Sequence, residues 1–175
     1  MPSDQVARLI KVLSEQDAGG RDQLLFYLLA STGIRVGTAV ALEVEDVNLE
    51  TGRLLLRSMK GDQPSSAWLD KQAVQLLESY LAKGPGGPLF VGRGERAIGS
   101  RQVCRRMKHW CEVAEIPGVW SPHALRHAFA MDLYERSADL ALVQAALHHR
   151  RITSTQVYAR PTDERLKAMV SGRIL

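Results

Sequence analysis

The spacing of apolar residues changes in the middle of the chain, and this change limits the folds that the chain can adopt. Apolar residues recur at helical spacing in residues 4–16 and again in residues 71–83. Between them, residues 52–69 hold a β-type run, a turn rich in Gly, Pro and Ser, and a second short apolar run. That pattern is typical of a hairpin or a small antiparallel sheet. The sequence therefore predicts a mainly α fold with a small antiparallel β-sheet, which is an α+β domain.

Residues that favour helix ends divide the rest of the chain into further helices. Gly33 can end one helix, and four residues or pairs can begin others: Ser100, Ser121-Pro122, Asp139 and Thr162. The Gly-rich residues 84–99 predict a surface loop that carries a short strand at residues 89–91. The helices expected from spacing and end signals are 4–16, 21–32, a short helix from 36, 71–83, 101–114, 123–136, 140–149 and 163–170.

The charge of the chain is unevenly distributed. Of 175 residues, 23 are Lys or Arg and 19 are Asp or Glu, which gives a net charge of +4. Residues 1–56 hold 5 basic and 8 acidic side chains, so 18 basic and 11 acidic side chains follow. A localised basic surface suggests a polyanionic partner, and nucleic acid first. A solvated basic face is the alternative that charge alone leaves open.

Neither a membrane span nor a leader is predicted. No apolar run reaches the roughly 18 to 20 residues that cross a bilayer. Residues 1–13 carry an acid early and no long apolar block, unlike a signal peptide. We therefore expect a cytoplasmic protein without a membrane partner.

Several basic side chains stand where they could bind an anion. His123 and Arg126 are three residues apart at a predicted helix start, so both can face one phosphate near the exposed N–H groups. Arg35 follows Gly33 among apolar residues, where a charge needs a partner or a ligand. Lys60 lies in the turn of the predicted hairpin. Taken singly, each of these side chains is more often an ordinary surface residue.

The spacing between His149 and Tyr158 predicts a corner in the chain. In one continuous helix, nine residues at about 100° each would put the two side chains on opposite faces. They can share a site only if the helix breaks, and residues 150–152 can turn before Thr153 or Ser154 caps a new helix. The sequence therefore allows Tyr158 to return towards His149.

The histidines do not form a metal-binding pattern. His123 and His127 have the i, i+4 spacing of a zinc helix, but no Glu follows His123 and no Cys pair lies nearby. We expect no metal site.

The order of these motifs resembles one enzyme family. The segments "TGIRVGTAVALEVEDV", "MKG", "SPHALRHAFA" and "LHHRRITSTQVYAR" follow one another as in the catalytic domain of tyrosine recombinases, or phage integrases. The resemblance covers nearly the whole chain. It implies that residues 1–175 form one catalytic domain with the fold of DNA breaking-rejoining enzymes. The usual N-terminal core-binding domain is not in this chain, which is either an excised catalytic domain or a naturally minimal recombinase.

The resemblance implies a site-specific recombinase that acts in DNA integration, excision or inversion. Tyr158 would attack a DNA phosphodiester to form a 3′-phosphotyrosine, and Lys60 would protonate the leaving 5′-oxygen. The other members of the implied catalytic set would bind the phosphate and share proton transfer. They are Arg35, His123, Arg126 and His149. No cofactor is implied.

Two positions depart from the family pattern. Thr38 stands where the family usually has a carboxylate, which puts the support of the site in doubt. His148 stands where the family usually has a glycine, so by register His149 is the catalytic histidine.

The expected partner is double-stranded DNA, bound by a protein that is a monomer in solution and a dimer or tetramer on DNA. One predicted helix carries basic residues that we expect to contact the DNA backbone. They are Arg101, Arg105, Arg106 and Lys108. Two alternatives stay open: a type IB topoisomerase-like nicking-closing enzyme, and a DNA-binding regulator that has lost cleavage.

Overall fold

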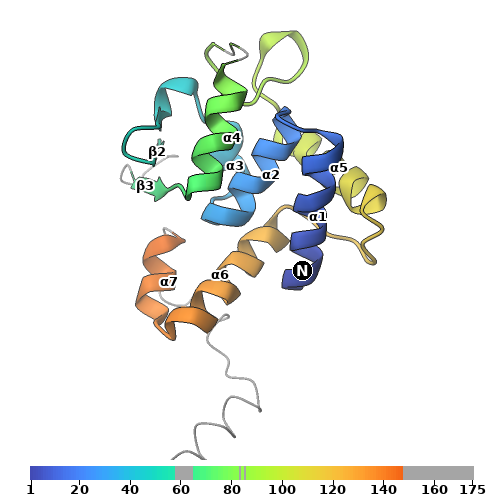
Figure 1. Ribbon diagram of the computed structural model, residues 1–175, viewed down its shortest axis with the longest axis vertical. Coiled ribbons are helices and arrows are strands. Elements are labelled where there is room, and N and C mark those ends of the chain that lie inside the picture. Colours follow the sequence, from blue (N-terminus) through green and yellow to red (C-terminus); the bar gives the residue numbers. More distant parts are fainter. Residues whose placement is uncertain (58–64, 83, 85, 148–175) are drawn as a thin grey trace, which may run out of the picture.

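The computed structural model describes residues 1–57, 65–82, 84 and 86–147 (Figure 1). Several predictions concern residues outside these ranges. They are the hairpin turn with Lys60, the histidines His148 and His149, the corner at residues 150–154, the nucleophile Tyr158 and the helix capped by Thr162.

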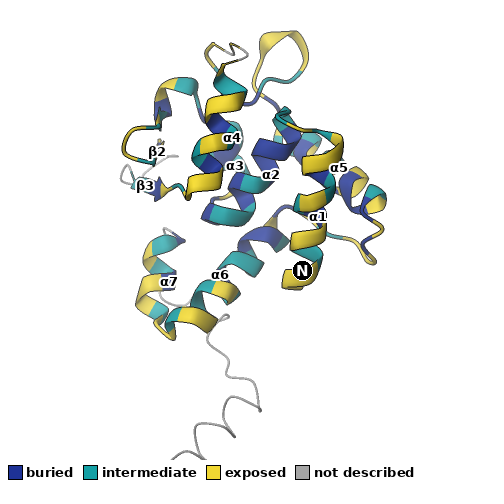
Figure 2. Ribbon diagram, in the orientation of Figure 1, coloured by how far each residue is buried: buried dark blue, intermediate teal, exposed yellow. Residues whose placement is uncertain are grey.

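The described chain is mainly helical, as predicted. Its seven α-helices are α1 (Ser3–Gln16), α2 (Arg21–Thr32), α3 (Val36–Val40), α4 (Lys71–Leu81), α5 (Ser100–Val113), α6 (His123–Ser137) and α7 (Leu140–Ala146). Two short 3₁₀ turns are η1 (Val44–Asp46) and η2 (Arg93–Glu95). Helix α2 packs against α1, α3, α4 and α6 and is buried or half-buried along its whole length (Figure 2). Its apolar residues lie all round the helix, which is typical of a central helix.

The predicted sheet is confirmed. Strands β1 (Val47–Asn48), β2 (Arg53–Leu56) and β3 (Ser65–Trp68) form one antiparallel sheet in the order β1-β2-β3. Leu54 and Ala67 pair across β2 and β3, and both are buried against the core. Alternate residues face outward, because side chains along a strand alternate between the faces of a sheet.

Two of the predicted helix caps are wrong. Asp139 caps α7 as expected, since its Oδ1 accepts hydrogen bonds from two backbone N–H groups at 2.8 and 3.0 Å. Helix α5, however, begins one residue earlier than expected, with Gly99 rather than Ser100 at the cap position. At α6 the cap position is Pro122, and Ser121 forms no side-chain cap. At both helices a backbone turn replaces the predicted hydroxyl cap.

The segment 84–99 packs partly into the core, whereas a surface loop was predicted. Leu89 and Phe90 are fully buried. The predicted strand at residues 89–91 is wrong, because isolated bridges pair Pro88 with Glu43 and Val91 with Ala97 instead. Apolar side chains therefore anchor this segment where β-pairing was expected.

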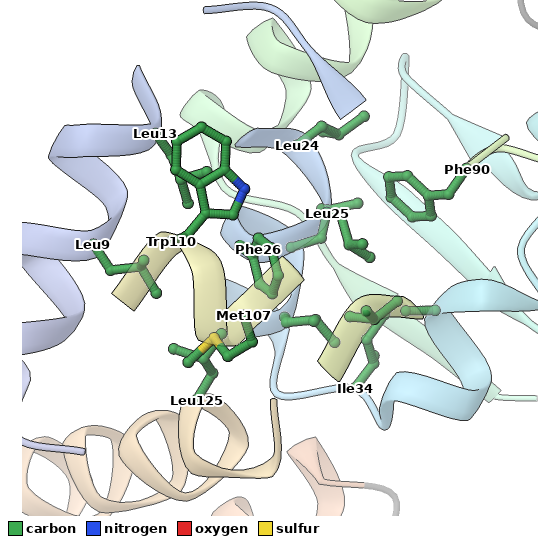
Figure 3. Packing of buried hydrophobic residues seen from close by; sticks show 14 of the residues in the cluster. Leu9, Leu13, Leu24, Leu25, Phe26, Ile34, Phe90, Met107, Trp110 and Leu125 are labelled. Carbon is green, nitrogen blue, oxygen red and sulfur yellow. The ribbon is translucent and has the colours of Figure 1, made fainter. Parts of the chain in front are cut away.

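The main hydrophobic core surrounds α2 (Figure 3). Phe26 and Leu25 of α2 lie between Leu13 of α1, Met107 of α5 and the buried Phe90. A second, smaller cluster joins α6 to α7. No described helix is both long enough and apolar enough to cross a membrane.

Candidate active site

Arg126 is the buried centre of the candidate site. Its side chain on α6 is only 2 % exposed. The guanidinium donates one hydrogen bond from Nη1 to the carbonyl of Gly33 at 2.5 Å and another from Nη2 to the carbonyl of Leu147 at 2.7 Å. These two hydrogen bonds offset part of the cost of burying the charge. Arg126 thus joins the end of α2 to the end of α7.

Arg35 lies just after the turn whose carbonyl Arg126 binds. Gly33 adopts a left-handed conformation with φ 64°, and a Cβ atom there would lie 2.4 Å from the ring of Phe129 on α6. Only glycine allows this turn and this close approach together. Ile34 is buried, and Arg35 follows as the exposed residue at the cap position of α3. The exposed guanidinium is therefore two residues from a carbonyl that Arg126 binds.

His123 begins α6 and is exposed, three residues before Arg126. Residues at this spacing share a helix face. His127, one turn further along, is half-buried, and burial lowers its pKa, with smaller contributions from the N-terminal amine and His123. His127 is thus more strongly held in its neutral form than an ordinary histidine.

Three of the six predicted catalytic residues lie in the two elements that Arg126 links to each other. Arg35, His123 and Arg126 come from the α2–α3 turn and the first turn of α6, which the hydrogen bond to Gly33 joins. Lys60, His149 and Tyr158 lie outside the described residues. Thr38, which stands where the family usually has a carboxylate, is half-buried in α3, one turn after Arg35.

Sequence reasoning missed an ion-pair cluster at the base of the hairpin. Arg57, just after β2, donates from Nε to the buried Asp46 at 2.7 Å and also pairs with Glu45 and, at 3.3 Å, with Glu43. Hydrogen bonds to Asp46 and Glu45 raise the pKa of Arg57. The cluster fixes β2 to η1 immediately before the hairpin turn. The sequence shows the acidic residues 43, 45 and 46. Their partner Arg57 is 11 or more residues further along the chain, so local spacing does not reveal the pairing.

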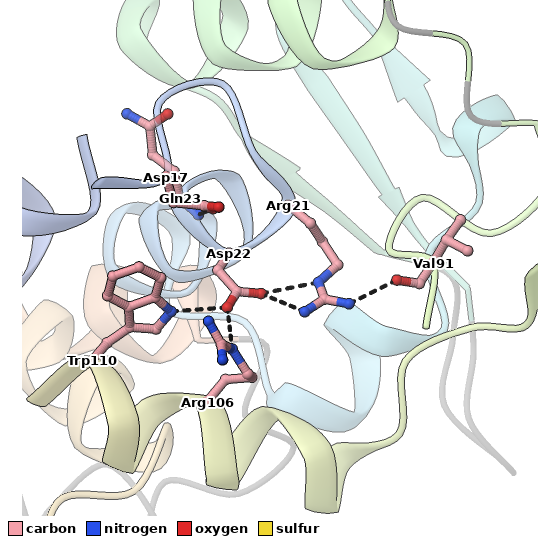
Figure 4. A network of polar contacts seen from close by, with 7 residues as sticks. All are labelled: Asp17, Arg21, Asp22, Gln23, Val91, Arg106 and Trp110. Atoms are coloured by element: carbon pink, nitrogen blue, oxygen red, sulfur yellow. Dashed lines mark hydrogen bonds and ion pairs between the residues drawn. The ribbon is translucent and has the colours of Figure 1, made fainter. Parts of the chain in front are cut away.

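The basic residues of α5 separate into two groups. Arg101, Arg105 and Lys108 are exposed, as expected for contacts with a partner. Arg106 is half-buried, and its Nε donates to Asp22 of α2 at 2.5 Å (Figure 4). A DNA-contacting role for all four residues stays a prediction. Arg106 also forms a contact inside the protein, with Asp22.

Asp22 is the acceptor in a buried network that sequence reasoning also missed (Figure 4). It is 3 % exposed and accepts hydrogen bonds from Trp110 Nε1 at 2.8 Å, from Arg106, and from two nitrogens of Arg21 at 2.9 and 2.7 Å. Burial acts to raise the pKa of Asp22, but these hydrogen bonds outweigh burial and hold the pKa below its usual range. Arg21 also donates to the carbonyl of Val91, which ties segment 84–99 to α2.

The described residues contain no group of three or more His, Cys, Asp or Glu side chains that could hold a metal ion.

Comparison with known proteins identifies the family. The sequence profile described as "Phage integrase family" matches residues 1–165. The tyrosine recombinase XerC of Vibrio cholerae is 32% identical over 161 residues, which are 89% of this chain and 51% of that protein. The chain thus spans about half the length of this curated relative.

Solved structures have the same fold. The crystal structure of the XerA recombinase superposes with a TM-score of 0.85 at 27% identity, over 98% of this chain and 61% of that one. The XerH site-specific recombinase bound to its difH substrate gives a TM-score of 0.83 at 24% identity, over 98% of this chain and 53% of that one. A profile match over nearly the whole chain, together with this fold, shows that the chain belongs to the phage integrase family of tyrosine recombinases.

Proposed function

We propose that residues 1–175 are the catalytic domain of a site-specific DNA recombinase that acts in integration, excision or inversion. The observation that carries the proposal is the fixed position of Arg126. Hydrogen bonds to the Gly33 and Leu147 carbonyls place its guanidinium between the Arg35 turn and the end of α7. Two guanidiniums from separate elements suit a phosphodiester, whose transition state carries additional negative charge.

In the proposed reaction, the phenolate of Tyr158 attacks the scissile phosphorus. The phosphorus–O5′ bond breaks, a 3′-phosphotyrosine forms, and Lys60 gives its proton to the leaving 5′-oxygen. Arg35 and Arg126 neutralise the non-bridging oxygens. Attack by a 5′-hydroxyl then reverses these steps and rejoins DNA, and no cofactor takes part.

The two histidines complete the proposed set. His123 at the start of α6 is exposed and close in sequence to Arg126, so it can donate a hydrogen bond to the phosphate. His149 follows the Leu147 carbonyl by two residues and would share proton transfer with His123.

The proposed partner is double-stranded DNA. The basic excess after residue 56 and the exposed side chains Arg101, Arg105 and Lys108 support this partner. So does the difH substrate named in the XerH structure. We propose a monomer in solution that assembles as a dimer or tetramer on DNA, and a cytoplasmic location fits this substrate.

A covalent-capture experiment tests the proposed function. The protein is incubated with a pool of nicked duplexes of randomised sequence, denatured, and assayed for DNA that stays attached. We expect attachment that Tyr158→Phe abolishes and that Tyr80→Phe, a change in half-buried Tyr80 of α4, preserves. Attachment that persists in Tyr158→Phe would contradict the proposal, and DNA binding without attachment would favour the regulator. Recombination between two captured sites would exclude a topoisomerase-like activity alone.

A further inference from the structure

The residues Glu43, Glu45, Asp46 and Arg57 form an ion-pair cluster that the proposed function does not use, and we call it the Arg57 cluster. Each nitrogen of the guanidinium contacts a different carboxylate: Nε lies 2.7 Å from Asp46, Nη1 lies 3.3 Å from Glu43, and Nη2 pairs with Glu45. The Arg57 side chain is 45% exposed, and partly exposed ion pairs contribute little to stability. Stability alone is thus a weak reason for three partners, whereas a planar guanidinium held at all three nitrogens has a fixed orientation.

The acidic side of the Arg57 cluster is a firmly held part of the fold. The Asp46 side chain is 1% exposed, and its Oδ2 accepts the backbone N–H of Glu43 at 2.9 Å while its Oδ1 accepts Arg57. The backbone N–H of Val44 donates to the carbonyl of Gly87 at 2.9 Å, which ties the same stretch to the segment that follows α4. Arg57 is therefore attached to a support that is itself fixed.

The Arg57 cluster lies between two predicted catalytic residues along the chain. Arg35 stands at the cap position of α3, and η1 is the next helical turn after α3. Arg57 is the first residue after β2, and Lys60 follows three residues later, outside the described part of the chain. Because each residue spans at most about 3.6 Å, the Cα of Lys60 lies within about 11 Å of the Cα of Arg57. The cluster thus joins the element that follows Arg35 to the start of the hairpin turn.

The charge of the Arg57 cluster does not suit a direct contact between Arg57 and DNA. Three carboxylates against one guanidinium leave the cluster with a net negative charge, which disfavours a phosphate. Hydrogen bonding to Arg57 lowers the pKa of Glu45, so this carboxylate stays charged at neutral pH. Arg57 is therefore better suited to hold a neighbouring element than to bind the substrate.

We propose that Arg57 is a positioning residue for the proton transfer from Lys60 to the leaving 5′-oxygen. By holding the end of β2 against η1, it fixes the start of the hairpin turn relative to Arg35, which binds the phosphate. Arg57 itself makes and breaks no bond. The inference rests on the proposed function, in which Lys60 is the proton donor, and it adds a residue that acts through this donor.

Replacement of the leaving oxygen by sulfur tests the proposal. A duplex that the protein captures is prepared in two forms, with either the natural 5′-oxygen or a 5′-sulfur at the scissile phosphate. A thiol has a pKa of about 8.5, far below that of an alcohol, so sulfur leaves without a proton. At saturating DNA, we expect Arg57→Gln to slow adduct formation about 10- to 100-fold on the oxygen duplex and less than about threefold on the sulfur duplex. Lys60→Ala should show the same pattern, with a larger loss on the oxygen duplex.

Two results with Arg57→Gln would overturn the proposal. A wild-type rate on the oxygen duplex would show that Arg57 is not needed for the reaction. An equal loss on both duplexes would show that it supports only the fold, which urea titration measures separately. Arg57→Lys keeps the charge but not the planar fork, so it provides the same test if Arg57→Gln does not fold. It should show a smaller loss that is again confined to the oxygen duplex.

Arg53→Gln is the matched control. It removes the same charge from the same strand, but Arg53 donates to Ser66 of β3 at 2.9 Å and so acts within the sheet. This control should react at wild-type rates on both duplexes. Asp46→Asn should reproduce the pattern of Arg57→Gln, and the double variant should be no slower than either single variant, because both break one contact. Equal losses in the control, or additive losses in the double variant, would overturn the proposal.

The same measurements separate this inference from the proposed function. A wild-type protein that forms no adduct on either duplex would defeat the proposed function. Tyr158-dependent adducts without an oxygen-specific loss in Arg57→Gln would defeat the inference about Arg57 alone. Equal losses on both duplexes in Lys60→Ala would defeat the role proposed for Lys60, and the inference with it.

Discussion

Arg126 donates a hydrogen bond to the carbonyl of Gly33, a residue 93 positions earlier in the chain. The bond joins the start of α6 to the end of α2, and the ring of Phe129 closes over the same turn. The relative position of Arg35 and Arg126 therefore depends on one glycine as much as on the arginines themselves.

Replacing this glycine should damage both the fold and the reaction. In Gly33→Ala, the new Cβ lies 2.4 Å from Phe129 and the residue keeps an unfavourable φ of 64°. We expect the free energy of unfolding to fall by about 2–4 kcal/mol, measured by urea titration, and DNA capture to fall with it. Gly86→Ala is the control, because its Cβ would meet nothing within 4 Å. Wild-type stability in Gly33→Ala would contradict the role of the turn.

Substitution by lysine should affect the stability of the protein differently at Arg126 and at Arg35. Arg126→Lys loses at least one of two buried hydrogen bonds to carbonyls, so we expect a loss of about 2–4 kcal/mol in unfolding free energy. Arg35→Lys changes an exposed side chain and should alter stability by less than about 0.5 kcal/mol. Both should slow adduct formation at least about 100-fold. Rapid capture by either variant would remove that arginine from the proposed site.

The Asp22 network predicts a particular dependence of stability on pH. The pKa of Asp22 is lowered in the folded protein, so its charged form stabilises the fold above the unfolded pKa of about 3.9. That stabilisation disappears as the pH falls through the lower, folded-state pKa. Asp22→Asn should therefore cost about 2–4 kcal/mol at pH 7, and the difference from wild type should shrink below about pH 4.

Urea unfolding between pH 7 and pH 3 measures this difference. Asp4→Asn, at an exposed position in the first turn of α1, is the matched control and should show little difference at any pH. A difference for Asp22→Asn that stays constant across this range would exclude a contribution from the carboxylate charge.

The stability of helix α7 should depend on its N-terminal cap, Asp139. Asp139→Ala removes the acceptor of two backbone N–H groups, which typically costs about 1 kcal/mol. Amides of α7 should then exchange with solvent about fivefold faster, while those of α2 keep their rates. Asp132→Ala, on the exposed face of α6, should leave exchange in α7 unchanged. Equal exchange in Asp139→Ala and wild type would show that the cap is dispensable.

The sequence predicts helices well here because local spacing determines them. The seven described helices were predicted from apolar periodicity together with helix-end signals, and strands β2 and β3 from a β-type run and a turn. Helix starts were less predictable, since Ser100 and Ser121 have suitable side chains but backbone turns take their place. The burial of Leu89 and Phe90 was missed because a Gly-rich segment gives no periodic signal for packing against distant helices.

The sequence predicts which residues form the candidate site, but it does not predict how they are arranged. Motif order identified Arg35, His123 and Arg126, yet nothing local indicates that Arg126 is buried between two carbonyls. The pairing of Asp22 with Arg106 crosses 84 residues and is equally invisible to local patterns. Both contacts exist because tertiary packing brings α2 against α6 and α5.

The enclosed position of α2 has a consequence for the kinds of sequence change that the protein can accept. Adding or deleting one residue within α2 would rotate its two ends relative to each other by about 100° and shift them by about 1.5 Å. Asp22 and Gly33 could then not both keep their partners, because neighbouring elements surround the helix. Neighbouring side chains can adjust to a substitution in α2, but they cannot compensate for a change in the length of this helix.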